Sequence, residues 1–210
     1  MTTRIIKEQF IRSASHFTSD ISLVTSLWRE IEKRYNSRGR YYHTLEHIDH
    51  VADTLLPFKE RFTNWDTVVF AVAYHDIVYN PIRSDNEESS SQFAAKALQM
   101  IGAEDRQIQR CQEFIIATKA HEPSDIETDL FTDADLSILG GDPSLYDLYS
   151  ENVRKEYGIF PALVYNSGRK KVLKHFLSME FIFKTPEFRE LLENQARGNL
   201  QRELQSYLKK

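Results

Sequence analysis

The stretch AYHDIVYN, residues 73–80, sets a histidine beside an aspartate within an apolar run. The wider segment 68–79 is apolar on all sides, which is typical of a helix through the centre of a bundle. A buried carboxylate costs several kcal/mol unless a cation or hydrogen-bond donors compensate its charge. A divalent metal ion would satisfy Asp76 and a neutral His75 together, so the pair predicts a metal site.

Further ligands are expected from the helix predicted over 44–60. Its buried face is formed by four apolar residues, Ile48, Val51, Leu55 and Phe58. At about 100° per residue, His47 lies roughly 60° from the centre of that face and His50 roughly 120° from it. We therefore expect His47 to point inward as a metal ligand and His50 to lie at the rim or surface.

The segment TDADLSIL, residues 132–139, predicts a short amphipathic helix that carries a carboxylate. Asp135 comes just before Leu136, Ile138 and Leu139, so this helix should face the core and present Asp135 as a fourth ligand. Asp133 fits better as the N-cap of the same helix, with a role in orienting a metal ligand as the alternative.

These residues must be positioned by helices, because apolar residues recur at helical spacing almost everywhere and strand patterns are scarce. The capping signals place helices near 5–17, 20–35, 44–60, 66–79, 86–102, 104–119, 132–139, 143–157, 160–184 and 185–208. The breaks between them are short, and there is neither a long linker nor a repeat. The prediction is one all-α domain, a helical bundle that spans residues 1–210.

Composition narrows the class of protein. The chain has 210 residues, of which 41% are hydrophobic and 12% aromatic, enough for a sizeable core. A net charge of −4 gives no long-range attraction to nucleic acid or to anionic lipid, so neither a nucleic-acid polymer nor a membrane is expected as a partner. With Cys111 as the one cysteine, no apolar signal core and no membrane-length apolar segment, the sequence predicts a cytoplasmic protein.

The order of His47, then HD at 75–76, then Asp135 resembles the metal-binding signature of the HD-domain phosphohydrolase superfamily, whose members are all-helical. The segments YYHTLEHI, YHDIVYNP, DNEESS, IIATKAH, VRKEY, GRKKVL and ARGNLQREL look similar to the group called predicted metal-dependent HD phosphohydrolases. Together they cover most of the chain. The resemblance implies an HD-type bundle that holds a metal through His47, His75, Asp76 and Asp135.

Two imidazoles and two carboxylates leave positions open on a six-coordinate ion, where a water and a phosphate oxygen can bind. The metal would lower the pKa of that water and polarise the phosphoryl group. We expect one divalent ion, and the ligand types accept Mn, Fe, Co, Ni, Zn or Mg. The expected activity is that of a phosphomonoesterase or nucleotide phosphohydrolase acting on a small phosphorylated substrate, nucleotides being suggested only by the resemblance.

A general acid or base is needed close to the attacking water. Some HD relatives carry an acid one helical turn after the HD pair, where this chain has Tyr79. Glu87, at a predicted helix start close to the pair, is the candidate that remains. The alternative is that Glu87 and Glu88 both only complement the helix dipole.

His121 is the one histidine between Asp76 and Asp135. HD relatives with two metals generally have two histidines in this interval, so one ion is favoured here. His121 is then expected to contact substrate or transfer a proton. A second ion held by His121 and an acid such as Glu87 stays open.

Phosphate requires cationic or hydrogen-bonding partners, and a net acidic protein must gather them locally. The candidates are Arg40 and His43, just before the first histidine-bearing helix, together with Arg154 and Arg169. For Lys170 and Lys171 a solvated position on a helix surface is the better interpretation.

Two other classes of function stay open. Some HD proteins hold two irons and act as oxygenases, but the lack of a second histidine between the HD pair and Asp135 argues against this. A nucleotide sensor without catalysis is the other alternative, although the four ligands are all present. The leucines of 191–208 could close the core or meet a second subunit, so a homodimer is one option.

Overall fold

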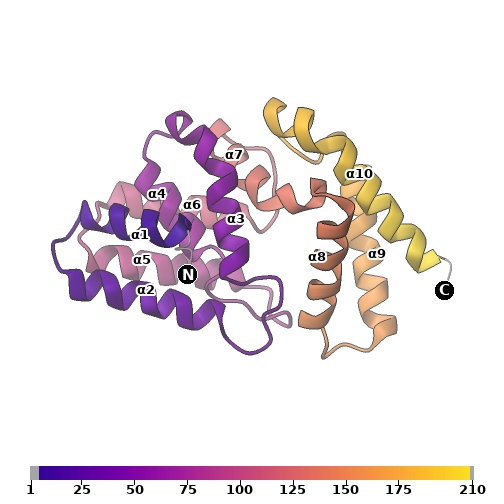
Figure 1. The fold of residues 1–210 in the computed structure, drawn as a ribbon, viewed down its shortest axis with the longest axis horizontal. Coiled ribbons are helices and arrows are strands. Elements are labelled where there is room, and N and C mark those ends of the chain that lie inside the picture. The colour runs from indigo at the N-terminus through magenta and orange to yellow at the C-terminus, as the bar shows by residue number, and fades with distance from the viewer. Residues whose placement is uncertain (1–4, 209–210) are drawn as a thin grey trace. The chain divides into compact units, whose positions relative to one another are not determined.

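The computed structural model describes residues 5–208, and within them every regular element is a helix. The prediction of an all-α fold is therefore confirmed. No helix in this described range is long and apolar enough to cross a membrane. Figure 1 shows the elements in order: α1 (Ile5–Ser15), α2 (Ile21–Tyr35), α3 (Leu45–Leu55), η1 (Leu56–Arg61), α4 (Trp65–Tyr74), α5 (Asn86–Met100), α6 (Asp105–Ala117), α7 (Ile126–Asp135), η2 (Leu136–Gly140), α8 (Pro143–Glu156), α9 (Ala162–Ser178) and α10 (Pro186–Leu208).

The chain forms two compact units, one up to Thr132 and one from Asp133 onward. Helix α7 is continuous across this border, with its last residues assigned to the second unit. Each unit has its own buried residues, described below. Whether the two behave as one domain over 1–210 stays a prediction.

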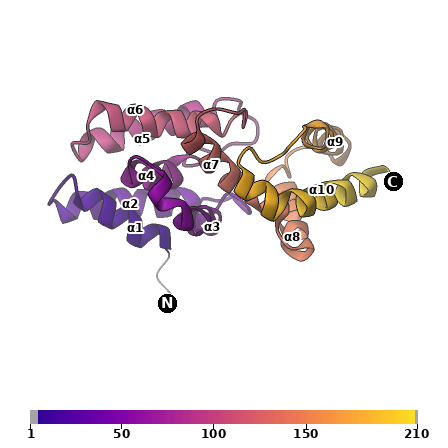
Figure 2. The same cartoon turned by 90° about the horizontal axis from the view of Figure 1, so that it is seen from above.

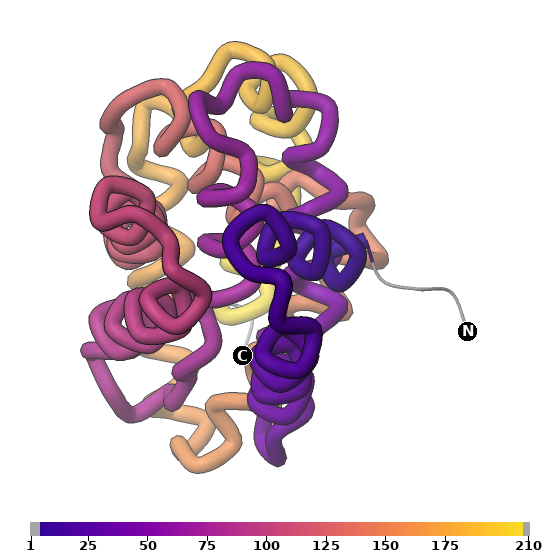
Figure 3. Tube along the Cα trace, turned by 90° about the vertical axis from the view of Figure 1, so that its left-hand side faces the viewer, coloured from indigo at the N-terminus to yellow at the C-terminus, as the bar shows by residue number. Residues whose placement is uncertain are grey.

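The first unit is built around α4, where every residue from Thr67 to Tyr74 is buried. Figure 2 shows α5 and α6 on one side of α4 and α1, α2 and α3 on the other. Figure 3 shows the pairs α1–α2 and α5–α6 of this unit from another direction. Rings fill the space between the helices: Phe10 of α1 contacts Phe70 and Tyr74 of α4 edge-on, at centroid distances of 5.7 and 5.9 Å. A helix covered on all sides needs no polar face, which explains its uniformly apolar sequence.

The second unit consists of η2, α8, α9 and α10. The buried Asn199 of α10 donates to the carbonyl oxygens of Leu139 (2.9 Å) and Gly141 (2.8 Å), which satisfies the end of η2. Gly140 lies so close to α10 that an added Cβ would fall 2.5 Å from the Cβ of Leu192. The close approach of η2 to α10 therefore requires glycine at this position.

Three of the predicted helices have wrong boundaries, and for two of them contacts distant in sequence are the reason. The helix predicted over 66–79 ends at Tyr74, since the next amides bond to side chains of other elements. The helix predicted over 132–139 is instead α7, which starts at Ile126 and is followed by the 3-10 helix η2. The helix predicted over 160–184 ends at Ser178, where the guanidinium of Arg197 binds the carbonyl oxygens of residues 177, 179 and 180.

Candidate metal site

Two helices of the first unit bring the predicted histidines together. His47 lies in the first turn of α3, whose start is capped by the Thr44 hydroxyl, and its side chain is buried at 5% exposure. His75 is the C-cap residue directly after α4, and it is 1% exposed. His50, three residues after His47, is exposed. The inward position of His47 and the surface position of His50 are both confirmed.

Three ligand atoms of this unit form what we call the donor triangle: Nε2 of His47, Nε2 of His75 and Oδ2 of Asp76. The two nitrogens are 3.1 Å apart. The oxygen is 3.3 Å from the His75 nitrogen and 3.6 Å from the His47 nitrogen. Ligands that share an ion at bonds of about 2.0–2.2 Å are separated by about 3.0 Å at right angles and about 3.4 Å in a tetrahedron. The triangle therefore has the size of three neighbouring positions around one metal ion.

The backbone sets which nitrogen of His75 can bind. Its Nδ1 lies 3.0 Å from the carbonyl oxygen of Val72, one turn earlier, and a carbonyl can only accept a hydrogen bond. Nδ1 thus carries the proton, and Nε2 keeps its lone pair directed at the donor triangle. A histidine oriented by a backbone carbonyl in this way is the usual arrangement at metal centres.

The environment favours a charged Asp76. Burial by itself raises the pKa of this carboxyl, but the positive charge that His75 and His43 carry when they are protonated lowers it more, so that the pKa lies below its ordinary value. The amide of Asp76 donates to the hydroxyl of Tyr35 of α2 at 3.3 Å. The carboxylate is therefore held ionised, in the protonation state that a metal ligand needs.

His43 and Tyr79 line one side of the donor triangle. The His43 Nε2 is 3.9 Å from Oδ2 of Asp76, and its ring stacks on Tyr79 with centroids 4.1 Å apart. Arg40 lies behind this pair: its guanidinium donates to the carbonyl oxygens of His43 and Ile77, both at 3.0 Å, and packs over the ring of Tyr79. The structure thus brings both predicted substrate residues to the site, with two nitrogens of Arg40 engaged by backbone carbonyls.

The turn after the HD pair is held by two side chains at the start of α5. The amide of Asn80 donates to the side-chain oxygen of Asn86, whose own amide group donates to the Asn80 carbonyl, both at 3.0 Å. The buried hydroxyl of Ser90 accepts from the amide of Val78 at 3.1 Å and donates to its carbonyl at 3.3 Å. The sequence analysis did not predict that these two residues hold the turn. Their spacing of four positions, which puts both on one face of a helix, is the pattern that could have indicated it.

The predicted acid/base residues lie beside this turn. Glu87 is half-buried in the first turn of α5. Its neighbour Glu88 pairs with Lys119, which also donates to the carbonyl of Ser84 at 2.8 Å. His121 follows two residues after Lys119, with a positive φ of 52° that L-residues rarely adopt. The Lys119 contacts therefore tie the segment of His121 to the start of α5, and the catalytic roles of Glu87 and His121 stay predictions.

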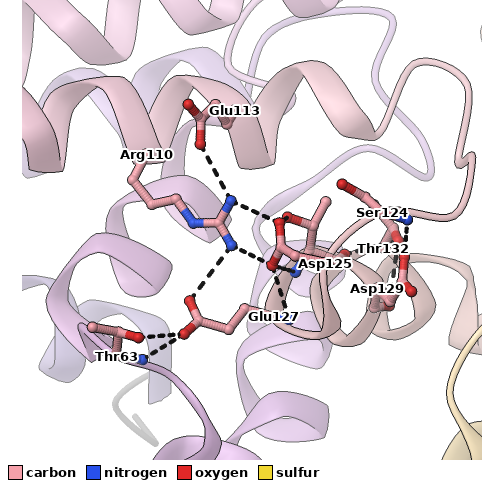
Figure 4. A network of polar contacts seen from close by, with 9 residues as sticks. Thr63, Arg110, Glu113, Ser124, Asp125, Glu127, Asp129 and Thr132 are labelled. Atoms are coloured by element: carbon pink, nitrogen blue, oxygen red, sulfur yellow. Dashed lines mark hydrogen bonds and ion pairs between the residues drawn. The ribbon is translucent and has the colours of Figure 1, made fainter.

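Helix α7 is fixed at its start by a network of charges. The carboxylate of Asp125 accepts from the amides of Glu127 and Thr128 as an N-cap, and it pairs with Arg110 of α6 at 2.6 Å. Figure 4 shows Arg110 also bound to Glu113, and Glu127 bound to Thr63. A surface cavity of about 570 Å³ borders this network, lined by residues of α5, α6 and the 124–128 segment, most of them polar. None of the donor-triangle residues lines it.

Two aspartates near the end of α7 have different surroundings. Asp133 is fully buried and accepts from the amides of Lys184 and Thr185, at 2.9 and 2.7 Å, so it does not cap a helix at 132 as one interpretation held. Its carboxylate instead fixes the segment before α10. Asp135 is the last residue of α7, half-buried and four positions after Phe131, whose ring meets that of His75 edge-on at 6.2 Å.

The arginines predicted for substrate binding have partners within the second unit. Arg169 is 9% exposed and pairs with Glu203 of α10 through its Nε at 2.8 Å and a second nitrogen at 2.9 Å. Arg154 donates to the carbonyl oxygens of Tyr157 and Phe160 and packs over Tyr165. Their substrate-binding roles stay predictions.

In comparisons with known proteins, no family model, no curated protein and no solved structure matches the chain.

Proposed function

We propose that this protein is a metal-dependent phosphohydrolase with an HD-type helical fold, and that one divalent ion binds at the donor triangle. The observation that carries the proposal is the convergence of His47, His75 and Asp76 within 3.6 Å in a mostly buried position. Three such atoms without a cation would crowd lone pairs and a negative charge together. A divalent ion removes this conflict and accepts all three as ligands.

The proposed fourth ligand is Asp135. Residues four apart lie one above the other on a helix, so Asp135 shares the face of α7 on which Phe131 meets His75. The order of His47, the HD pair and Asp135 along the chain is what supports this assignment.

A divalent ion in this position would supply an activated water and would neutralise charge on a phosphoryl group. The residues of the chain then have separate tasks. His75 is held in the ligating tautomer by Val72, and Asp76 is fixed by Tyr35. His43, stacked on Tyr79 beside Asp76, is placed to donate to a phosphate oxygen. Glu87 and His121 are the proposed groups for proton transfer, and both belong to segments that border the turn after the HD pair.

The proposed substrate is a small phosphate ester, and a nucleotide is the leading class because of the resemblance to HD phosphohydrolases. A cytoplasmic location belongs to the same proposal. Cys111 is fully buried, and burial raises the pKa of its thiol, so it is a structural rather than a reactive cysteine.

The test is phosphate release by protein stripped of metal and reloaded with Mn²⁺, screened over nucleotides and sugar phosphates. We expect at least one substrate to be hydrolysed by the wild type and by Asp53→Asn, which changes an exposed aspartate on α3. Asp76→Asn should lose the activity together with the bound metal. Equal activity of Asp76→Asn and Asp53→Asn would show that the donor triangle is not the catalytic centre.

A further inference from the structure

The stretch 157–179, which contains all of α9, has no aspartate or glutamate, in a protein whose net charge is −4. It carries four cations, Arg169, Lys170, Lys171 and Lys174. Arg169 is neutralised internally by Glu203. Among the described residues the three lysines have neither an ion pair nor a hydrogen bond, whereas cations such as Arg110 and Arg202 are paired with acids. The stretch is thus a local positive surface.

Aliphatic side chains are exposed at one end of the same stretch. Leu163 and Val164, in the first turn of α9, are 85% and 54% exposed, and Ile159 in the preceding turn is 68% exposed. Figure 1 shows that this turn forms the tip of the pair α8 and α9. Exposed aliphatic residues clustered beside unpaired cations mark an interaction surface.

The exposed face of α9 combines both features. Tyr165, Arg169 and Leu173 define the buried side of the helix. At 100° per residue, Leu163, Val164, Lys171 and Lys174 fall within one arc on the opposite side. A helix of this kind, with lysines and aliphatic residues on its solvent side, suits the boundary between lipid headgroups and acyl chains.

We propose that the tip of α8 and α9, with the exposed face of α9, docks on an anionic lipid bilayer. Ile159, Leu163 and Val164 enter the headgroup region, and Lys170, Lys171 and Lys174 contact lipid phosphates. The net charge of the whole protein predicts no attraction to lipid. The three lysines, however, would lie within a Debye length of the membrane surface, whereas the acidic residues farther away are screened from it by salt.

Nucleic acid fits this surface less well. Single-stranded sites use exposed aromatic rings for stacking and arginine for bidentate contacts to phosphate. Here the one arginine of α9 is paired inside the unit, and the rings of Tyr157 and Phe160 face each other at 5.9 Å and are half-buried.

The test is co-sedimentation of the full chain with vesicles of phosphatidylcholine alone or with added phosphatidylserine. We expect binding only to the vesicles with phosphatidylserine. The triple variant Lys170→Gln, Lys171→Gln, Lys174→Gln should bind about a hundredfold more weakly, at roughly 1 kcal/mol for each lysine near the surface. Leu163→Ser should weaken binding about tenfold, because the leucine that would enter the headgroup region is replaced by a polar side chain.

Matched controls separate this surface from charge and hydrophobicity in general. Lys33→Gln, Lys59→Gln and Lys96→Gln together remove the same charge from exposed positions of the first unit, and Leu191→Ser removes a leucine that is 72% exposed. Both should bind like the wild type. The proposal is overturned by equal binding to neutral vesicles, by no binding, or by equal losses in test and control variants. It is also overturned if the vesicles do not bind and the α9 lysines are instead required for binding a poly-glutamate peptide or an oligonucleotide.

Discussion

The Nε2 atoms of His47 and His75 face each other at 3.1 Å across the gap between α3 and the end of α4. Both rings are buried, and the Nδ1 proton of His75 is committed to Val72. The lone pair of His75 is therefore directed at the His47 nitrogen, with the Asp76 carboxylate beside both. The proposed metal site, and with it the proposed phosphohydrolase activity, rests on this arrangement of the two nitrogens and the carboxylate.

Asp135 and Asp133 should be separable by mutation although they are two residues apart. Asp135→Ala is expected to reduce metal retention strongly and to leave the free energy of unfolding nearly unchanged. Asp133→Ala should lower that free energy by about 3 kcal/mol, since the buried amides of Lys184 and Thr185 and the Lys184 ammonium lose their acceptor. Metal content and urea unfolding measured on both variants check this, and the reverse assignment would refute it.

Arg40 is predicted to act mainly by holding the loop before α3. Arg40→Gln removes two hydrogen bonds to the carbonyls of His43 and Ile77, so we expect the free energy of unfolding to fall by about 1–3 kcal/mol. Arg38→Gln, at an exposed position of the same loop, should leave stability unchanged. If Arg40→Gln instead raised only the KM for substrate, Arg40 would be a phosphate ligand and not a structural clamp.

Ser90 should control the mobility of the turn after the HD pair. In Ser90→Ala the amide and carbonyl of Val78 lose their partner, so amide hydrogens around Val78 should exchange at least tenfold faster, for a cost of about 1.5 kcal/mol. Ser89→Ala, one residue away, is the control, because the Ser89 hydroxyl accepts from the side chain of Arg83 and not from the backbone of Val78. Unchanged exchange in Ser90→Ala would mean that Asn86 holds the turn without it.

Glu203 should make the protein sensitive to acid. Burial raises the pKa of this carboxyl, but its contacts with Arg169 and Tyr146 lower it more, so the folded pKa is below the unfolded value. Its contribution to stability is thus present above about pH 4.3 and is lost as the pH falls further. Glu203→Gln should have a lower free energy of unfolding than the wild type at pH 7, and it should lose less of it than the wild type does between pH 5 and 3. The control is Glu190→Gln, at an exposed position of the same helix, whose free energy of unfolding should vary with pH as in the wild type.

Local sequence patterns were enough to predict the helical class and the inward position of His47. Periodicity identified the buried face of α3, with Ile48, Val51 and Leu55 at 0% exposure. The uniformly apolar sequence of α4 also predicted its central place. These features depend on residues within a few turns of one another, which is the range that helical periodicity reports.

Features that depend on distant residues could not be predicted in this way. The end of α4 at Tyr74 reflects hydrogen bonds that the amides of the next residues donate to the hydroxyls of Tyr35 and Ser90, which no local pattern contains. Asp133 has the residue type and position of an N-cap, yet its partners lie about fifty positions away at Lys184 and Thr185. The pairing of Arg169 with Glu203 was hidden for the same reason.

The most direct test of the central claim is the metal content of the purified, chelator-free protein by elemental mass spectrometry, with His47→Ala and His50→Ala as matched variants on α3. About one divalent ion per chain is expected in the wild type and in His50→Ala. His47→Ala should lose at least tenfold, because even the loss of a group that only orients a metal ligand lowers metal affinity by about that factor. No metal in the wild type after incubation with Mn²⁺ or Ni²⁺, or full occupancy in His47→Ala, would contradict a metal centre at the donor triangle.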